Sequence, residues 1–355
     1  MEHPKTAAFG KKALFIGGTG VISAAVCRRA LACGWQVTVL NRGTNNARLP
    51  EGARSITADI RDEAAVAEAL AHEHFDVAAD FIAFTEADVQ RDMRLFGGRV
   101  GQYIFISSAS AYQKPLAALP ITESTPLVNP YWQYSRDKIA CEDALMARHR
   151  ADGFPVTIVR PSHTYCTRNL VVALHGVHGG WQVLARRLAG KPTIIPGDGT
   201  ALWTATHADD FAVGFVGLMG NPHALGTAVH ITTDETMTWD QIYAVMAGAM
   251  GRPLHAVHSA SEFLAAGGKA AGYDFEGALL GDKAANVRFD NTKIKRLVPE
   301  FCCKISMAQG LRETVHWMLS HPEAQMPDPD FDAWCDRVLA ARQAAMEAFE
   351  RGVRG

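Results

Sequence analysis

The chain has 355 residues, of which 48% are hydrophobic and 20% are charged, and its formal net charge is −2. This length and composition suit one large domain or two joined domains with a sizeable core. The small charge gives no electrostatic reason to expect nucleic acid or an anionic membrane surface as a partner. No apolar run approaches the ~20 residues that are needed to cross a bilayer, so no membrane association is expected.

Three further features of the sequence bear on the location of the protein and on metal binding. Residues 1–10 lack the apolar stretch of a signal peptide, and we expect a disordered lead-in there. The seven cysteines show no Cys-x-x-Cys spacing, which indicates reduced thiols in a cytoplasmic protein. His175 and His178 lie close together, but no third ligand is suitably spaced, so we expect no metal site.

The first third of the chain alternates short apolar runs with helical patterns. Strands that alternate with helices predict a parallel sheet covered on both faces, and we assign an α/β Rossmann fold, doubly wound, to residues 11–164. In chain order, the expected elements are strand 13–16, helix 20–33, strands 36–40 and 55–57, helix 62–71, strand 76–81, helix 86–96, strand 103–106, a helix from Tyr134 to about Arg150, and strand 156–159.

Beyond Pro161 the pattern loosens, and glycines and histidines crowd the next stretch. We expect a smaller, mostly C-terminal substrate-binding region over residues 165–327. Residues 328–355 form a charged amphipathic pattern that predicts a peripheral helix. Residues 113–130 contain four prolines and little periodicity, which indicates a surface loop.

The first predicted strand runs directly into a glycine-rich turn, GGTGVIS, from Gly17 to Ser23. This is a variant of the dinucleotide fingerprint, in which glycines let the backbone turn tightly and approach a pyrophosphate. The N-terminus of the following helix supplies free N–H groups for the phosphates. Ser23 replaces the third glycine, which is a mild departure. A tight turn without a ligand is the alternative.

The end of the second strand bears on the choice of cofactor. A site for NAD usually has an acidic residue there, but this chain reads Leu40-Asn41-Arg42-Gly43. Arg42 is able to pair with a 2′-phosphate or stack on adenine, and this slightly favours NADP over NAD. A solvated arginine in a turn is the alternative. Asp59 is placed either to contact the adenine edge or to cap a helix beginning at Arg61.

Tyr134 and Lys138 lie four residues apart in the segment YSRDK. On a helix these positions share one face, and a neighbouring cation lowers the pKa of a phenol toward neutrality. The pair therefore predicts an acid–base unit for moving a proton to or from a hydroxyl or carbonyl oxygen. The same spacing also occurs on solvated helix faces, so its meaning depends on the other motifs.

The motifs GGTGVIS, ADIRD, ISSASAY and YSRDK occur in this order, and over residues 11–320 the chain resembles the extended short-chain dehydrogenase/reductase (NAD-dependent epimerase/dehydratase) family. The resemblance implies that Tyr134 moves the proton, Ser108 holds the substrate oxygen and Lys138 binds the nicotinamide ribose. It also implies that residues 206–235 return to the core, with Asp209 and Asp210 capping a helix.

The resemblance further assigns cofactor and substrate contacts. Cofactor contacts are expected from Gly17, Thr19, Gly20, Val21, Ile22, Arg42, Asp59, Ile60, Phe81, Ile82, Ala83, Ser107, Tyr134, Lys138, Pro161 and His163, and substrate contacts from Ser110, Trp132, His163 and Trp203. Within these sets, Ser107 is equally compatible with a packing role, and the tryptophans with core packing.

Three departures from the family pattern narrow the chemistry. Dehydratases of this family carry Asp-Glu directly after the catalytic serine or threonine, whereas this chain has Ala109-Ser110. Sugar-nucleotide decarboxylases generally keep a glutamate at the Ser110 position. The arginine that often clamps the substrate diphosphate is replaced by Trp203, which offers stacking and one N–H donor but no charge. Dehydration and decarboxylation are therefore disfavoured.

The sequence favours an NAD(P)-dependent epimerase that transfers a hydride reversibly at a carbinol or carbonyl carbon of a sugar or sugar nucleotide. The first alternative is an NADP(H)-dependent ketoreductase or dehydrogenase with a non-nucleotide substrate. A non-catalytic relative that senses nucleotides or binds RNA is the second. The resemblance also implies a homodimer formed through the helices at residues 86–96 and 131–149.

Overall fold

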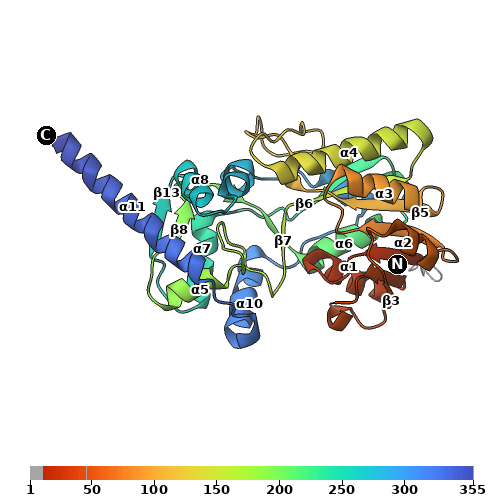
Figure 1. Cartoon of the computed structure of the whole chain (residues 1–355), viewed down its shortest axis with the longest axis horizontal. Helices are drawn as coiled ribbons and strands as arrows, with labels where there is room; N and C mark the ends of the chain where they lie inside the picture. The colour runs from red at the N-terminus through yellow and green to blue at the C-terminus, as the bar shows by residue number, and fades with distance from the viewer. Residues whose placement is uncertain (1–10, 45, 355) are drawn as a thin grey trace.

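The computed structural model describes residues 11–44 and 46–354, and the lead-in expected at residues 1–10 lies outside them (Figure 1). A seven-stranded sheet, in the order β11-β6-β5-β4-β1-β2-β3, forms the centre of the larger part, and all its pairings are parallel. Its strands are β1 (Lys12–Ile16), β2 (Gln36–Asn41), β3 (Arg54–Thr57), β4 (Phe75–Asp80), β5 (Val100–Ile106), β6 (Val156–Pro161) and β11 (Thr227–Ile231).

Helices cover both faces of this sheet, because successive side chains of a strand point to opposite faces and both sets are apolar. In β1, Phe15 packs into one core, whereas Leu14 and Ile16 pack into the other. The first core lies under α1 (Val21–Ala32), α6 (Ala208–Leu218) and α9 (Thr292–Leu297), and the second under α2 (Glu63–Ala69), α3 (Glu86–Phe96) and α4 (Gln133–Asp152) (Figure 1). This arrangement confirms the predicted Rossmann fold.

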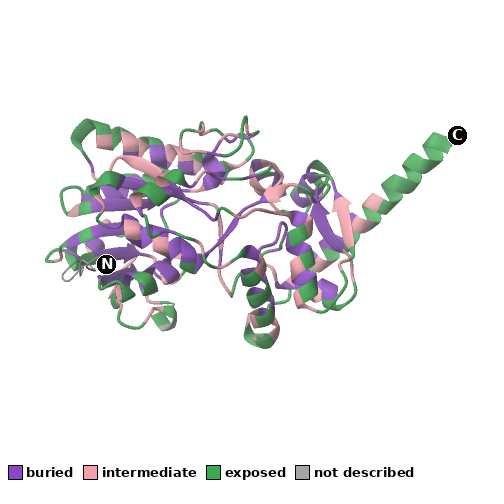
Figure 2. Ribbon diagram, turned by 180° about the vertical axis from the view of Figure 1, so that it is seen from behind, coloured by how far each residue is buried: buried purple, intermediate pink, exposed green. Residues whose placement is uncertain are grey.

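The smaller part contains a core of its own, seen as a second group of buried segments in Figure 2. Three two-stranded pairings connect its loops: β7 (His163–Tyr165) with β10 (Ala205–His207), β9 (Leu202–Trp203) with β12 (Met237–Thr238), and β8 (Thr193–Pro196) with β13 (Ala256–Ser259). Its helices are α5 (Trp181–Leu188), α7 (Trp239–Ala249), α8 (Ser261–Ala270), the π-helix η4 (Glu276–Lys283), α10 (Met307–Ser320) and α11 (Pro329–Arg354).

The C-terminal helix is only partly peripheral. The side chains of Phe331 and Trp334, in the first turns of α11, are buried in the core of the smaller part. From residue 340 onward the helix is largely exposed and extends away from the body, with the C-terminus at its far end (Figures 1 and 2). The amphipathic pattern therefore marked a helix whose first half contributes to the core.

Two local predictions require correction. The N-cap of α6 is His207, whose Nδ1 accepts from the backbone N–H of Asp209, so Asp209 and Asp210 lie in the first turn. The proline-rich segment 113–130 is irregular, but it does not lie wholly on the surface. Ile121 is completely buried because its backbone pairs with that of the segment around Phe289.

Among the described residues, no helix combines the length and the apolar character that crossing a bilayer requires.

Candidate functional site

A first cavity of about 360 Å³ opens where β1 and β2 end, at the carboxyl edge of the sheet. Its floor is the glycine turn that follows β1. Gly17 adopts a φ of +79°, and a Cβ there would lie 2.7 Å from Ile82. A Cβ at Gly18 would lie 2.6 Å from Val39. Side chains at either position would therefore displace the walls of a site where a ligand needs to approach the backbone.

The helix behind this turn is shaped as the fingerprint requires. Gly20 is the N-cap of α1, and Val21 and Ile22 form its half-buried first turn. Ser23, buried at the position of the third glycine, accepts a hydrogen bond of 2.9 Å from the N–H of Gly20. The first amides of α1 have no intrahelical partner, so the helix has a positive end that directly follows Thr19, which lines the cavity, although Gly20, Val21 and Ile22 do not.

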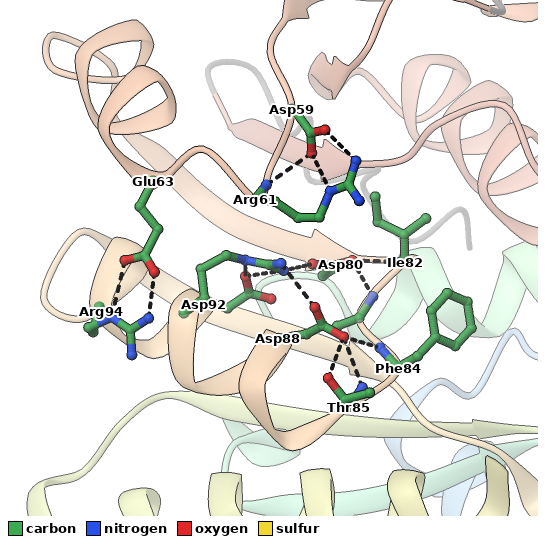
Figure 3. A network of polar contacts seen from close by, with 12 residues as sticks. Asp59, Arg61, Glu63, Asp80, Ile82, Phe84, Thr85, Asp88, Asp92 and Arg94 are labelled. Carbon is green, nitrogen blue, oxygen red and sulfur yellow. Dashed lines mark hydrogen bonds and ion pairs between the residues drawn. The ribbon is translucent and has the colours of Figure 1, made fainter.

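Several of the side chains expected to contact the cofactor gather at the same cavity. Thr19, Arg42, Asp59, Ile60 and Ile82 all line it. The Asp59 carboxylate accepts from the guanidinium of Arg61, at 3.0 Å from Nε, and these hydrogen bonds hold the pKa of Asp59 well below its usual range (Figure 3).

Asp59 does not cap the next helix, because that role belongs to Asp62, which accepts from the N–H of Ala65. Arg42 is exposed and forms no hydrogen bond or ion pair with the other residues that the structure describes. The basic group at the end of β2 is therefore open to a ligand.

A buried charge network supports the wall of this cavity, and sequence reasoning missed it (Figure 3). Asp80 ends β4 and accepts from the backbone N–H groups of Ile82 and Ala83, at 2.6 and 2.9 Å. The guanidinium of Arg91 lies 3.2 Å from Asp80 and 2.8 Å from Asp92. Buried charges are tolerated when they are paired in this way, so the network fixes the loop after β4. In the sequence, charged residues at helical spacing after a buried strand were the only feature that could have indicated this network.

Two other expected cofactor contacts have mainly structural positions. Phe81 is half-buried, and its ring packs edge-on against Phe15, with centroids 5.6 Å apart. The hydroxyl of Ser107 donates to the buried carboxylate of Glu142, which also binds Arg160. Ser107 is therefore a packing residue, the alternative that the sequence left open.

A second cavity, also of about 360 Å³, lies between the two parts of the chain. Ser108 and Tyr134 both face it, although they come from different elements. Ser108 follows β5, and Tyr134 lies in the first turn of α4. The indole of Trp132 lies beside the phenol, with ring centroids 4.9 Å apart. The remaining polar lining is provided by Ser110, Ser162, His163 and Asp282, and the apolar lining by Ala109, Pro161, Val287 and Phe289.

The serines form a connected chain of hydroxyl groups. Ser110 lies 2.9 Å from the Ser108 hydroxyl and accepts a hydrogen bond of 2.8 Å from Ser135. Ser110, expected to contact substrate, lines the cavity but is almost completely buried, and its contact with Ser108 orients that hydroxyl.

Lys138 lies one turn after Tyr134, but its ammonium is directed elsewhere. It is buried and donates to the backbone carbonyls of Ala83 and Ile106, at 2.6 and 2.8 Å. Burial lowers the pKa of Lys138 to about 8. The ammonium therefore links the loop after β4 to the end of β5.

The phenol of Tyr134 does not have the lowered pKa that the spacing predicted. Burial raises the pKa of Tyr134 above its ordinary value, and the carboxylate of Asp282 adds to the rise, while the hydroxyl of Ser108 opposes it. The Lys138 ammonium lies 5.8 Å from the ring centroid and is engaged by carbonyl oxygens. In this structure Tyr134 is therefore a protonated phenol at neutral pH.

Of the two expected substrate contacts beyond β6, one lines the second cavity and the other lies in the core. His163 lines the second cavity, and burial lowers its pKa to about 3, so its imidazole is neutral. Trp203 is 1% exposed and stacks on Trp239 in the core, with centroids 5.3 Å apart. Trp203 does not line the cavity, because this large apolar side chain completes the interior of the smaller part.

Asp282 was not found by sequence reasoning, although its side chain lines the second cavity. It lies in the π-helix η4, which packs against the start of α4. The amide of Asn129 donates to the carbonyls of Gly281 and Ser110, at 2.7 and 2.8 Å. A Cβ at Gly277 would lie 2.1 Å from Trp132, so this contact needs glycine. In the sequence, the Gly-x-x-x-Gly spacing of residues 277 and 281 was the feature that could have indicated this close packing.

Within residues 11–44 and 46–354, no group of three or more His, Cys, Asp and Glu side chains is arranged to hold a metal ion.

Comparisons with known proteins agree with this arrangement. A model of the NAD dependent epimerase/dehydratase family matches residues 13–97 and 93–231. The 2′-dehydrokanamycin reductase of Streptomyces kanamyceticus is 30% identical over 254 residues, which span 72% of this chain and 71% of that protein. The chloroplast stem-loop binding protein of 41 kDa b of Arabidopsis thaliana is 27% identical over 256 residues, 68% of this chain and 64% of that protein.

A solved structure shows the same fold. The epimerase Mth375 of Methanothermobacter thermautotrophicus gives a TM-score of 0.72 at 16% identity, covering 90% of this chain and 98% of that chain.

Proposed function

Because the chain belongs to the NAD dependent epimerase/dehydratase family, we propose that it is an NADP(H)-dependent oxidoreductase that interconverts a ketone and a secondary alcohol on a sugar without a nucleotide. The observation that carries this proposal is the lining of the second cavity, which includes Ser108 and Tyr134 but no arginine or lysine. A diphosphate substrate would need such cationic partners. The relative named as a reductase of 2′-dehydrokanamycin supports the same reaction class.

The first cavity suits a nicotinamide dinucleotide. Gly17 and Gly18 leave space for a close approach to the backbone, and the N-terminus of α1 favours the pyrophosphate. When bound, the cofactor donates or accepts the hydride at its nicotinamide ring. Pro161 and Tyr134, which line the second cavity, are the residues that the family resemblance would assign to the nicotinamide end.

The second cavity supplies the proton chemistry. The raised pKa of Tyr134 keeps the phenol protonated at neutral pH, so it is ready to donate to a carbonyl oxygen that receives a hydride at its carbon. The hydroxyl of Ser108, oriented by Ser110, would donate to the same oxygen and hold it in place. In the reverse direction the phenolate of Tyr134 that this donation leaves would take up the proton of the alcohol.

The preference for NADP(H) rests on Arg42. It lines the first cavity at the end of β2, where no acidic residue is present to accept from a ribose 2′-hydroxyl. Its guanidinium has no partner among the described residues and would pair with a 2′-phosphate in a bidentate manner. Arg61 lies near the same position, but its charge is already matched by Asp59.

Epimerisation of a sugar is the second candidate. The observation that favours it is that Ser108 and Tyr134 face one cavity and serve hydride transfer in both directions. An epimerase would retain the cofactor and return the hydride to the opposite face, whereas a reductase would exchange it. A purely nucleic-acid-binding role is less consistent with the site, because Tyr134, Ser108 and Lys138 would then have no function together.

The test is hydride transfer from NADPH or NADH to a panel of keto-sugars, followed by the absorbance of the reduced cofactor. Replacing Tyr134 by phenylalanine removes only the hydroxyl, and turnover should fall by about 10²–10⁴-fold. Tyr131 lies nearby but is exposed and does not line the cavity, so Tyr131→Phe is a matched control that should retain activity.

Equal turnover by Tyr134→Phe and the unaltered protein would refute the proposed mechanism. Conversion of a secondary alcohol to its epimer with no net change in the cofactor would instead identify the second candidate.

A further inference from the structure

Asp282 is the one carboxylate among the residues that line the second cavity. In the described part of the chain, no group donates a hydrogen bond to its side chain or forms an ion pair with it. Burial raises the pKa of Asp282, which reflects the cost of holding this charge away from water. A half-buried carboxylate that faces an open cavity without a partner is a position where a cationic ligand group gains a charge-assisted hydrogen bond.

The two nearby lysines do not fill this role. Lys283 donates its ammonium to the carbonyl of Ala173 at 3.1 Å. Lys114 is 4% exposed, and its ammonium has no hydrogen-bond partner. Neither lysine lines the cavity. Their charges oppose the effect of burial on the pKa of Asp282 and so favour its ionised form. The carboxyl group therefore faces the cavity without a bonded counter-charge, and an ammonium beside it would favour its ionised form.

The fold holds this carboxylate in a fixed position. Asp282 lies in a π-helix, a rare element that occurs frequently at functional sites. The carbonyl before it, of Gly281, accepts from Asn129, and a Cβ at Gly281 would lie 2.9 Å from Trp132. Trp132 in turn contacts Tyr134, so Trp132 connects the π-helix η4 to helix α4.

Resting on the proposed function, we infer that the second cavity takes an amino-bearing sugar or cyclitol, whose ammonium pairs with the carboxylate of Asp282 while its carbinol or carbonyl carbon faces Tyr134. The other groups around the cavity suit such a ligand. The neutral imidazole of His163 is able to accept from or donate to a hydroxyl, and the indole of Trp132 adds an aromatic side chain to the lining.

The pairing also links binding to chemistry. The charge of Asp282 is one of the causes that raise the pKa of Tyr134. An ammonium at Asp282 would compensate that charge and bring the phenol closer to the range in which it gives up its proton readily. An amino substrate should therefore react faster, as well as bind more tightly, than its hydroxyl analogue.

Isothermal titration of the NADP⁺-loaded protein tests the inference without requiring turnover. The probes are methyl glucoside and its four analogues in which one hydroxyl, at carbon two, three, four or six, is replaced by an amine. We expect at least one amine to bind about tenfold or more tightly than the parent, as for a hydrogen bond to a charged group. Asp282→Asn should abolish this advantage, so that the amines bind no more tightly than the parent, whereas Asp282→Glu should retain part of it.

The inference is overturned if no amine binds more tightly than methyl glucoside, or if Asp282→Asn weakens all five probes equally. Thermal melting shows whether each variant is folded. Failure of the proposed function is distinguishable, because it appears as an absence of hydride transfer to keto-sugars that depends on Tyr134. Binding of an amine that depends on Asp282 would stand in that case.

Discussion

The burial of the Lys138 ammonium should lower the free energy of unfolding by an amount that can be measured. Its ordinary pKa of 10.5 falls to about 8 because the ammonium is buried. Each pKa unit corresponds to about 1.36 kcal/mol, so the charged form is about 3 kcal/mol less favourable in the folded protein than in the unfolded chain. Replacement by methionine, which has a similar volume and no charge, removes this cost.

The sign of the pH dependence follows from the lowered pKa. Below about pH 8 Lys138 is protonated in both states, and the full cost is present. Between about pH 8 and 10.5 the folded protein loses the proton while the unfolded chain keeps it, so stability rises with pH. Relative to Lys138→Met, the unaltered protein should gain about 2–3 kcal/mol in free energy of unfolding from pH 7 to pH 10.

Urea unfolding of both proteins at pH 7, 8.5 and 10, without added nucleotide, measures this difference. The carbonyls of Ala83 and Ile106 lose a donor in the variant, but that loss is independent of pH and changes only the offset. The thiol of Cys141, whose pKa burial raises to about 12, does not titrate in this range in the folded protein, and its titration in the unfolded chain is common to both proteins and cancels in the comparison. As a control, Lys269→Met removes an exposed ammonium at the end of α8 and should give no such slope. A stability difference for Lys138→Met that stays constant from pH 7 to pH 10 would refute the reasoning.

Three further outcomes are expected. Gly18→Ala should weaken NADP⁺ binding and cost about 1–3 kcal/mol of stability, because the added Cβ would lie 2.6 Å from a side chain of β2. Nucleotide titration and thermal melting measure the two effects. Gly248→Ala is the control, because no atom lies within 4 Å of a Cβ at that position. Arg42→Gln should reduce the preference for NADPH over NADH by about tenfold or more, measured as the ratio of kcat/KM values; an unchanged ratio would remove Arg42 from the cofactor site. The outer faces of α3 and α4 should form a homodimer contact, and sedimentation of a monomer at micromolar concentration would contradict it.

The sequence alone was sufficient for the Rossmann core and for the centre of the candidate site. Alternating strands and helices are a local pattern, and the glycine turn needs its residues within one short segment. Gly17 and Gly18 have the close contacts that the fingerprint implies. Ser108 and Tyr134 lie in motifs of known order, and the structure places them at one cavity.

The tertiary structure decided which charges and aromatic rings face that cavity. Lys138 has the predicted position, but two carbonyls from other elements direct its ammonium away from the phenol. Trp203 replaces an arginine of the family pattern, yet it packs in the core, while Asp282 reaches the cavity from a distant π-helix. Such contacts join segments far apart in the chain, and their distances depend on how the two parts pack. Local patterns contain no information about that packing, and for this reason the sequence indicated the family, while the proposals about reaction and substrate needed the fold.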